Sequence, residues 1–283
     1  MLKKYFGDRK FYKMVLLLAI PIMIQNGITN FVNMLDNVMV GQLGKTAIAA
    51  VEVGGKPGFV FAFVSGAVAT VTGIMVSQYM GKEDDEKVDV SMSVNLLVMM
   101  AIALLTTMAC LLIPQMLTGI FTKDAAVIKT GTDYVRIVSL VYPLSGIASI
   151  LAVQIRCNDH SEYPLYISAV AAIVNTALNF ILIFGHLGAP ALGVKGAAIA
   201  SVASQVVNLA LMIRFYNKIC KFRFCIKLSE VELKQYITIL FPIVFNEFMW
   251  TVGQNVNTFI YGHMGTDELA GMALTGPIQG LSI

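Results

Sequence analysis

The sequence predicts an all-α integral membrane protein, a polytopic helical bundle made of one six-helix lobe and the start of a parallel second repeat. Three observations lead to this fold class: long stretches without charge, an uneven distribution of Lys and Arg, and two similar segments far apart in the chain. Hydrophobic residues make up 57% of the chain and charged residues 13%, against about 25% charged in a typical soluble domain. This composition favours a chain that lies in a lipid bilayer.

The uncharged stretches predict where the chain crosses the membrane. A helix needs about 20 mainly apolar residues to span the hydrocarbon core, and seven stretches reach or approach that length, the last interrupted only by Glu247. Residues 267–283 look like the opening of an eighth span. The first span follows a basic N-terminus without a small-residue cleavage site, so we interpret it as a span and not a cleaved leader. The expected spans are 14–39, 48–80, 90–119, 125–155, 163–185, 196–216 and 235–262, with kinks at the glycines of the second and at Pro114 in the third.

The basic residues predict the orientation of these spans. With the N-terminus in the cytoplasm, fourteen of the 20 Lys and Arg residues fall on the cytoplasmic side, and six, including Lys56, fall on the other. Cytoplasmic loops of membrane proteins carry such an excess. We therefore expect a multi-pass protein of the plasma membrane with a cytoplasmic N-terminus. The net charge of +3 gives no reason to expect a nucleic-acid partner.

Residues 18–50 and 239–271 align without gaps, which indicates an internal repeat. Six spans separate the starts of the two copies, so both copies run in the same direction and are related by an axis along the membrane normal. The expected domains are a six-helix lobe at 1–216, a cytoplasmic loop at 217–234 and the truncated start of a second lobe at 235–283. The remainder of that lobe, or a complementary chain, is the expected partner. The matched pairs are Pro21 with Pro242, Asn33 with Gln254, Asp36 with Asn257, Gly41 with Gly262, Gly44 with Gly265, and Ala49 with Ala270.

Both copies of the repeat carry a polar face inside an apolar helix. At 100° per residue, the polar residues of the first span share an arc of about 140°, and those of the seventh span share an arc of the same phase. Polar groups are costly in lipid unless they are paired or hydrated, so the two faces are expected to line one cavity for small organic molecules. Helix–helix hydrogen bonding without a ligand is the alternative. The substrate-cavity candidates are Gln25, Asn26, Thr29, Asn30, Glu247, Gln254 and Asn257.

Asp36 is the only acid inside the first span, where apolar surroundings disfavour its charged form. Such a carboxyl group can take up and release a proton or coordinate a cation. Oxygen atoms that could assist it come from Asn33, from Asn175 and Asn179 at i and i+4 of the fifth span, and from Ser201 in the sixth. No metal beyond possible sodium at Asp36 and no cofactor is expected. The sequence also lacks the phosphate-binding, nucleophile-elbow and zinc-protease motifs that would indicate an enzyme.

These features together resemble the multidrug and toxic compound extrusion (MATE) family of secondary transporters. The first span carries Pro21, Asp36 and Gly41-x-x-Gly44, and an Ala-rich start of the second span follows. The turn RCND at 156–159 then precedes Pro164, and the segments VNTALNFILIFG at 174–185 and GVKGAAIAS at 193–201 follow in order. The resemblance covers the whole chain and is strongest in the order and spacing of its motifs.

The resemblance implies twelve helices in two six-helix lobes, with a cavity that opens to one side at a time. It implies export of cationic and amphipathic drugs in exchange for protons or sodium, with Asp36 as the cation site of the first lobe. The usual helper positions fall on Asn175, Asn179 and Ser201, and the acid of the seventh helix on Glu247. Many members have Asp where this chain has Asn179, so the site would hold one carboxylate. A lipid-linked saccharide flippase of similar architecture and an inactive or half-transporter fragment are the alternatives.

Overall fold

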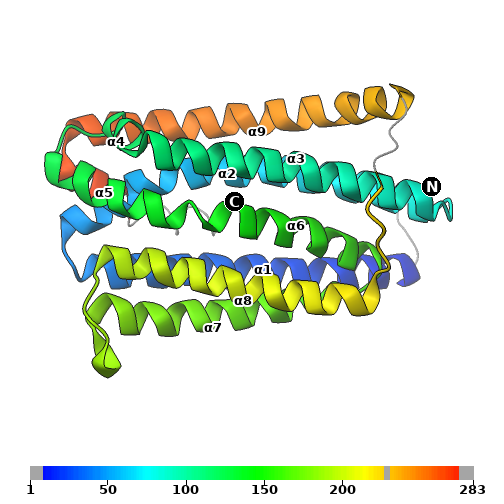
Figure 1. The fold of residues 1–283 in the computed structure, drawn as a ribbon, viewed down its shortest axis with the longest axis horizontal. Helices are drawn as coiled ribbons and strands as arrows, with labels where there is room; N and C mark the ends of the chain where they lie inside the picture. Colours follow the sequence, from blue (N-terminus) through cyan, green and yellow to red (C-terminus); the bar gives the residue numbers. More distant parts are fainter. Residues whose placement is uncertain (1–8, 226–229, 274–283) are drawn as a thin grey trace.

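The chain folds into a bundle of helices whose axes run close to the long axis of the molecule (Figure 1). The structure, a computed structural model, describes residues 9–225 and 230–273, and these contain no β-strand. The all-α membrane bundle predicted from the sequence is therefore confirmed. The helices are α1 (Arg9–Gly41), α2 (Lys45–Met80), α3 (Asp85–Leu112), α4 (Pro114–Gly119), α5 (Ala125–Val138), α6 (Val141–Cys157), α7 (Glu162–Phe184), the short 3-10 helix η2 (His186–Gly188), α8 (Val194–Ile219) and α9 (Glu230–Met264).

The two ends of the bundle collect different connections. The N-terminal end holds the start of α1, the α2–α3 and α6–α7 turns, and the link from α8 to α9 (Figure 1). The opposite end, here called the distal end, holds the α1–α2 turn, α4, the start of α5, η2 and the end of α9 (Figure 1). A single large apolar cluster runs through the bundle and includes Met99, Ile150 and Ile155, which are completely buried.

Among the described residues, five helices are long and apolar enough to cross a membrane, and the bent pair α5–α6 passes the same test when it is taken as one span. These six correspond to the first six predicted spans. The predicted seventh span lies within α9, where the apolar stretch found among the described residues is Tyr236–Asn246. The kinks expected from glycine and proline differ between helices: α2 continues unbroken through Pro57, whereas α3 ends before Pro114, where Ile113 leaves the helical region at φ −126° and ψ 40°.

The predicted span at 125–155 corresponds to two helices, α5 and α6, which meet at a bend of 43°. Pro143 has no N–H group, so the carbonyl of Ser139 loses its helical donor four residues ahead. The hydroxyl of Thr107 in α3 donates to that carbonyl over 3.0 Å, and the Ser139 hydroxyl donates to the Arg136 carbonyl over 2.9 Å. The Tyr142 N–H donates to the same Ser139 carbonyl over 3.2 Å, so the group that loses its partner at Pro143 has one donor from the neighbouring helix and one from its own chain.

The close packing of α7 and α8 brings the later polar residues together. Gly185 ends α7 in the left-handed conformation, at φ 76°, and the chain returns into α8 after Gly193. Gly196 lies directly against the backbone of α7: a Cβ atom there would stand 2.5 Å from the carbonyl oxygen of Leu182. The neighbouring Ala197, Ala198 and Ala200 are buried. The small residues at 196, 197, 198 and 200 therefore allow the close approach that the sequence predicts.

The second copy of the repeat begins with the same local structure as the first. Gly41 and its match Gly262 lie in the last turn of α1 and α9, and a new helix begins directly after Gly44 and after Gly265. The described part of this second helix covers residues 266–273. α9 lies alongside α2, on the far side of the bundle from α7 and α8 (Figure 1).

Candidate functional site

A cavity of about 270 Å³ lies between α1, α7 and α8 and is closed at the back by the α5–α6 bend. Its wall is polar on three sides, because α1, α7 and α8 each turn hydroxyl or amide groups toward it. Apolar residues on either side of the bend complete it. The lining residues are Ile28, Thr29, Val32, Asn33, Asp36, Val138, Val141, Ser168, Ala171, Ala172, Asn175, Ser201, Ser204, Gln205 and Asn208.

Asp36 is the acidic group of this cavity and is held by α7. The side-chain amide of Asn179, which is completely buried, donates to Asp36 Oδ1 over 2.5 Å. Asn175, one helical turn earlier on α7, lies beside both groups. The i and i+4 spacing of the two Asn residues, together with the close packing of α7 on α1, thus places two amides against one half-buried carboxylate.

The Asn175 amide has two possible orientations, and they present different atoms to Asp36. The nearer amide atom of Asn175 lies 3.1 Å from Asp36 Oδ1 and 3.3 Å from Oδ2. With nitrogen at this position, Asn175 donates to the carboxylate. With oxygen there, Asn175 accepts from Asn179 over 3.1 Å, and its oxygen faces the carboxylate oxygens. Two facing oxygen atoms at this distance require a proton or a cation between them. One orientation of Asn175 therefore fits a charged Asp36, and the other fits a protonated or cation-bound Asp36.

The remaining cation-site candidates lie on the same cavity wall. Asn33 is exposed to the cavity from α1, one turn before Asp36. Ser201 lines the cavity from α8 and donates its hydroxyl to the Ala197 carbonyl over 3.1 Å. Four of the five predicted residues therefore line one cavity, and the fifth, Asn179, reaches the cavity residue Asp36 by a hydrogen bond.

The substrate-cavity candidates of α1 divide into two groups. Thr29 lines the cavity and donates to the Gln25 carbonyl over 3.0 Å. Gln25 does not line it: its amide nitrogen donates to the Ser168 hydroxyl over 2.7 Å and its oxygen accepts from Arg156 over 2.8 Å. Asn26 is exposed and Asn30 is half-buried, and neither lines the cavity. The first polar face is therefore partly a cavity wall and partly a contact with α6 and α7.

Of the substrate-cavity candidates in the second copy, the described one, Asn257, lies away from this cavity. Asn257 is exposed on α9, and the cavity wall contains no described residue of α9. The side chains of Glu247 and Gln254 lie outside the described part of the structure. The expectation that both polar faces line this one cavity is therefore not met by Asn257, because α9 packs along α2 and not along α1.

Sequence reasoning missed two charged contacts inside the bundle. Arg156, counted as a cytoplasmic residue, reaches Gln25, and its Nε atom is buried without a hydrogen-bond partner. Lys56, counted on the outer side, is only 9% exposed within α2 and forms an ion pair with Glu52 at 2.5 Å. The i and i+4 spacing of Glu52 and Lys56 was the available signal for the second contact. Within residues 9–225 and 230–273, no three His, Cys, Asp or Glu side chains are grouped to hold a metal ion.

Comparison with known proteins gives consistent matches. The family model described as MatE matches residues 21–181. The "Uncharacterized transporter YisQ" of Bacillus subtilis is 25% identical over 262 residues, which cover 88% of this chain and 56% of that protein. The "Probable multidrug resistance protein NorM" of Rhizobium meliloti is 30% identical over 188 residues, which cover 66% of this chain and 40% of that protein.

A solved structure shows the same fold. The structure described as "Outward-facing conformation of a multidrug resistance MATE family transporter of the MOP superfamily" superposes with a TM-score of 0.75 at 18% identity. The match covers 97% of this chain and 66% of that one. The chain spans about half the length of the two relatives named above.

Proposed function

This chain belongs to the MatE family of efflux transporters, whose model matches more than half of its residues, and from that premise we propose that it acts as a secondary active antiporter. It would export organic cationic or amphipathic compounds in exchange for protons or sodium. We further propose that it lies in the plasma membrane with the N-terminus in the cytoplasm, so that the distal end faces outward. Relatives named as multidrug resistance proteins support the substrate class.

The observation that carries the proposal is the position of Asp36 on the cavity wall with two amides against it. An antiporter needs a site whose occupation by the coupling ion changes the balance between conformations. A charged Asp36 favours donors from both Asn179 and Asn175, whereas a protonated or sodium-bound Asp36 favours the orientation in which the Asn175 oxygen faces it. The contact between α1 and α7 would therefore change with the occupation of the site.

The surroundings of Asp36 fit either coupling ion. Sodium prefers oxygen ligands, and the Asp36 carboxylate, the Asn175 oxygen, Asn33 and Ser201 could supply them. A proton needs only the carboxyl group and one acceptor. A bound organic cation would compete for the same negative charge, because Asp36 is the acid on this wall. Competition of this kind is what makes exchange obligatory.

Transport in vesicles under an imposed gradient tests the proposal. With the complete gene product, Asp36→Asn should abolish exchange of an organic cation for protons or sodium, while folding and insertion persist because the change is nearly isosteric. Asp133→Asn is the matched control, since Asp133 pairs with Lys195 at 3.0 Å outside the cavity. Comparing a proton gradient with a sodium gradient identifies the ion.

Two outcomes would count against this assignment. Exchange at the wild-type rate in the Asp36→Asn variant would show that Asp36 has only a structural role. The flippase hypothesis would be favoured if the protein moved a lipid-linked saccharide across the membrane and did not move organic cations under a gradient.

A further inference from the structure

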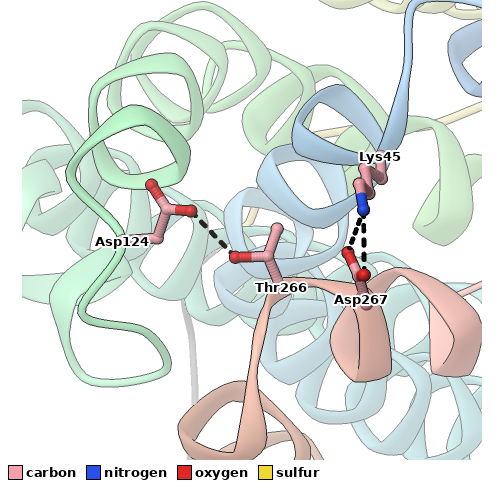
Figure 2. Close-up of polar contacts among 4 residues, drawn as sticks. All are labelled: Lys45, Asp124, Thr266 and Asp267. Atoms are coloured by element: carbon pink, nitrogen blue, oxygen red, sulfur yellow. Dashed lines mark hydrogen bonds and ion pairs between the residues drawn. The ribbon is translucent and has the colours of Figure 1, made fainter.

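The two copies of the repeat meet at the distal end through a small polar contact. The ammonium group of Lys45, the first residue of α2, lies 2.7 and 2.8 Å from the two carboxylate oxygens of Asp267 (Figure 2). Beside it, the Thr266 hydroxyl donates to Asp124 Oδ2 over 2.8 Å (Figure 2). Lys45 and Asp124 belong to the first repeat, whereas Thr266 and Asp267 begin the second helix of the second repeat.

The polar contact covers an apolar one. Leu269 is completely buried against Ala49, Ala50, Val53 and Val127 of the first repeat. Ala270 and Ala273 pack against Ile48. The backbones are close as well, because a Cβ atom at Gly262 would overlap the carbonyl oxygen of Phe121. The start of the second repeat is therefore seated in a fitted surface at the distal end.

The charge of Lys45 is explained by its partner and not by its own helix. Lys45 opens α2, where the positive end of the helix dipole disfavours a cation, and Gly44 before it provides no side-chain cap. Asp267, in the first turn of its helix, is favoured by the same effect. The ion pair with Asp267 offsets the unfavourable interaction between the Lys45 charge and the dipole of α2.

We infer that Lys45, Asp124, Thr266 and Asp267 form a clasp between the two repeats, which closes the distal end and opens when that end admits or releases a substrate. This inference rests on the proposed function, since alternating access requires the repeats to part at one end at a time. The side chains of Lys45 and Asp267 remain 67% and 66% exposed. An exposed ion pair of this kind contributes little stability and can be broken without a large barrier.

Distances across the clasp, measured between spin labels, test this inference without a transport assay. The labels replace Leu43, which is 40% exposed in the first repeat, and Met264, which is 64% exposed at the end of α9, in a background without the four native cysteines. The matched control pair is Leu43 with Leu187, which is 90% exposed and belongs to the first repeat. Neither pair replaces a clasp residue.

The complete gene product should show a short and a long Leu43–Met264 distance, and a single Leu43–Leu187 distance. Lys45→Gln combined with Asp267→Asn should raise the ratio of the long to the short population about two- to fivefold. The charge-swapped pair Lys45→Asp with Asp267→Lys should restore the wild-type ratio. Neutralising the Lys195–Asp133 pair within the first repeat should change nothing.

Identical distance distributions in the wild-type and neutralised proteins would overturn the clasp. So would an equal change in the control pair, which would indicate general loosening of the bundle. The result is independent of Asp36: a protein that fails to exchange cations can still show a clasp, and a working antiporter can lack one.

Discussion

Gly196→Ala is expected to disturb both the α7–α8 packing and the Asp36 site. A Cβ atom at residue 196 would lie 2.5 Å from the carbonyl oxygen and 2.7 Å from the carbonyl carbon of Leu182, and ordinary contact begins at 3.4 Å. The neighbouring atoms are backbone and cannot rotate away, so α8 must move from α7 by about 0.9 Å. Overpacking of this size costs about 1–3 kcal/mol.

The displacement should also reach the cavity. The Asn175 amide and the Ser204 hydroxyl face each other across the same two helices at 3.5 Å, the limit of a hydrogen bond. Moving α8 outward by nearly 1 Å would break that contact and leave Asn175 less constrained beside Asp36. We therefore expect weaker cation dependence of transport in addition to lower stability.

The assay is thermal unfolding of the purified protein in detergent, followed by size-exclusion chromatography of heated samples. The matched control is Gly66→Ala, since Gly66 lies inside α2 and a Cβ atom there meets nothing within 4 Å. The control should melt at or above the wild-type temperature, because Ala has the higher helix propensity. If Gly196→Ala melts as the control does, the argument from close backbone packing is refuted.

Three further predictions follow from individual contacts. Thr266→Val should raise the pKa of Asp124 toward 3.8 in a carboxyl NMR titration, because the hydrogen bond from the Thr266 hydroxyl lowers that pKa more than those from the Ala126 and Val127 amides do. An unchanged pKa of Asp124 would show that the Thr266–Asp124 contact is not part of the clasp. Because the pKa is lowered, Asp124 keeps its charge above pH 3.8 and loses it only under more acidic conditions. Thr107→Val should lower the free energy of unfolding by about 0.5–1.5 kcal/mol, since it removes one of the two donors to the Ser139 carbonyl and leaves only the Tyr142 N–H at 3.2 Å. Thr106→Val, whose hydroxyl only reaches its own helix at Ile102, should be nearly neutral, and equal losses would contradict the explanation of the bend. Lys56→Met should destabilise the protein more than Lys56→Met combined with Glu52→Met, because the single change leaves the half-buried Glu52 carboxylate without its partner. If the double variant melts at the lower temperature in the same assay, the ion pair itself stabilises the fold.

Much of the fold follows from the sequence because lipid imposes a simple rule. Backbone groups in a bilayer must pair within their own segment, so long uncharged stretches become helices almost regardless of detail. The first six spans were found on this ground, and the start of each repeat has the same local structure in both copies. The repeat also indicated which turns would correspond, as Gly44 and Gly265 show.

The features that escaped prediction depend on partners far away in the chain. At the bend after Val138, Thr107 of α3 donates to the Ser139 carbonyl, and the sequence of 125–155 alone does not contain that contact. Arg156 was assigned to a loop because charge is expected at span ends, yet Gln25 accepts from it inside the bundle. Packing of α9 along α2, and not opposite α1, is likewise a property of the assembled bundle.

The candidate cation site was predictable as a set of residues but not as a geometry. Helical periodicity placed Asp36 and Asn33 on one face, and Asn175 and Asn179 on another. These two faces come together because α1 packs against α7, and helical periodicity alone does not indicate which helices pack together. Asn179 shows the difference: the sequence suggested an oxygen ligand, whereas the structure turns its nitrogen toward the carboxylate. The roles of these residues stay predictions until transport is measured.

The bend between α5 and α6 has a mechanical consequence for the cavity. Val138 and Val141, the two cavity residues on this side, stand immediately before and after the interruption. A continuous helix resists bending, but at this point the regular i to i+4 pattern of backbone hydrogen bonds is interrupted, and the Ser139 carbonyl accepts from the Tyr142 N–H and the Thr107 hydroxyl instead. We therefore expect the wall at the α5–α6 bend to yield more readily than the walls formed by α1, α7 and α8, so that a large occupant would change the angle between α5 and α6 before it displaced the other helices.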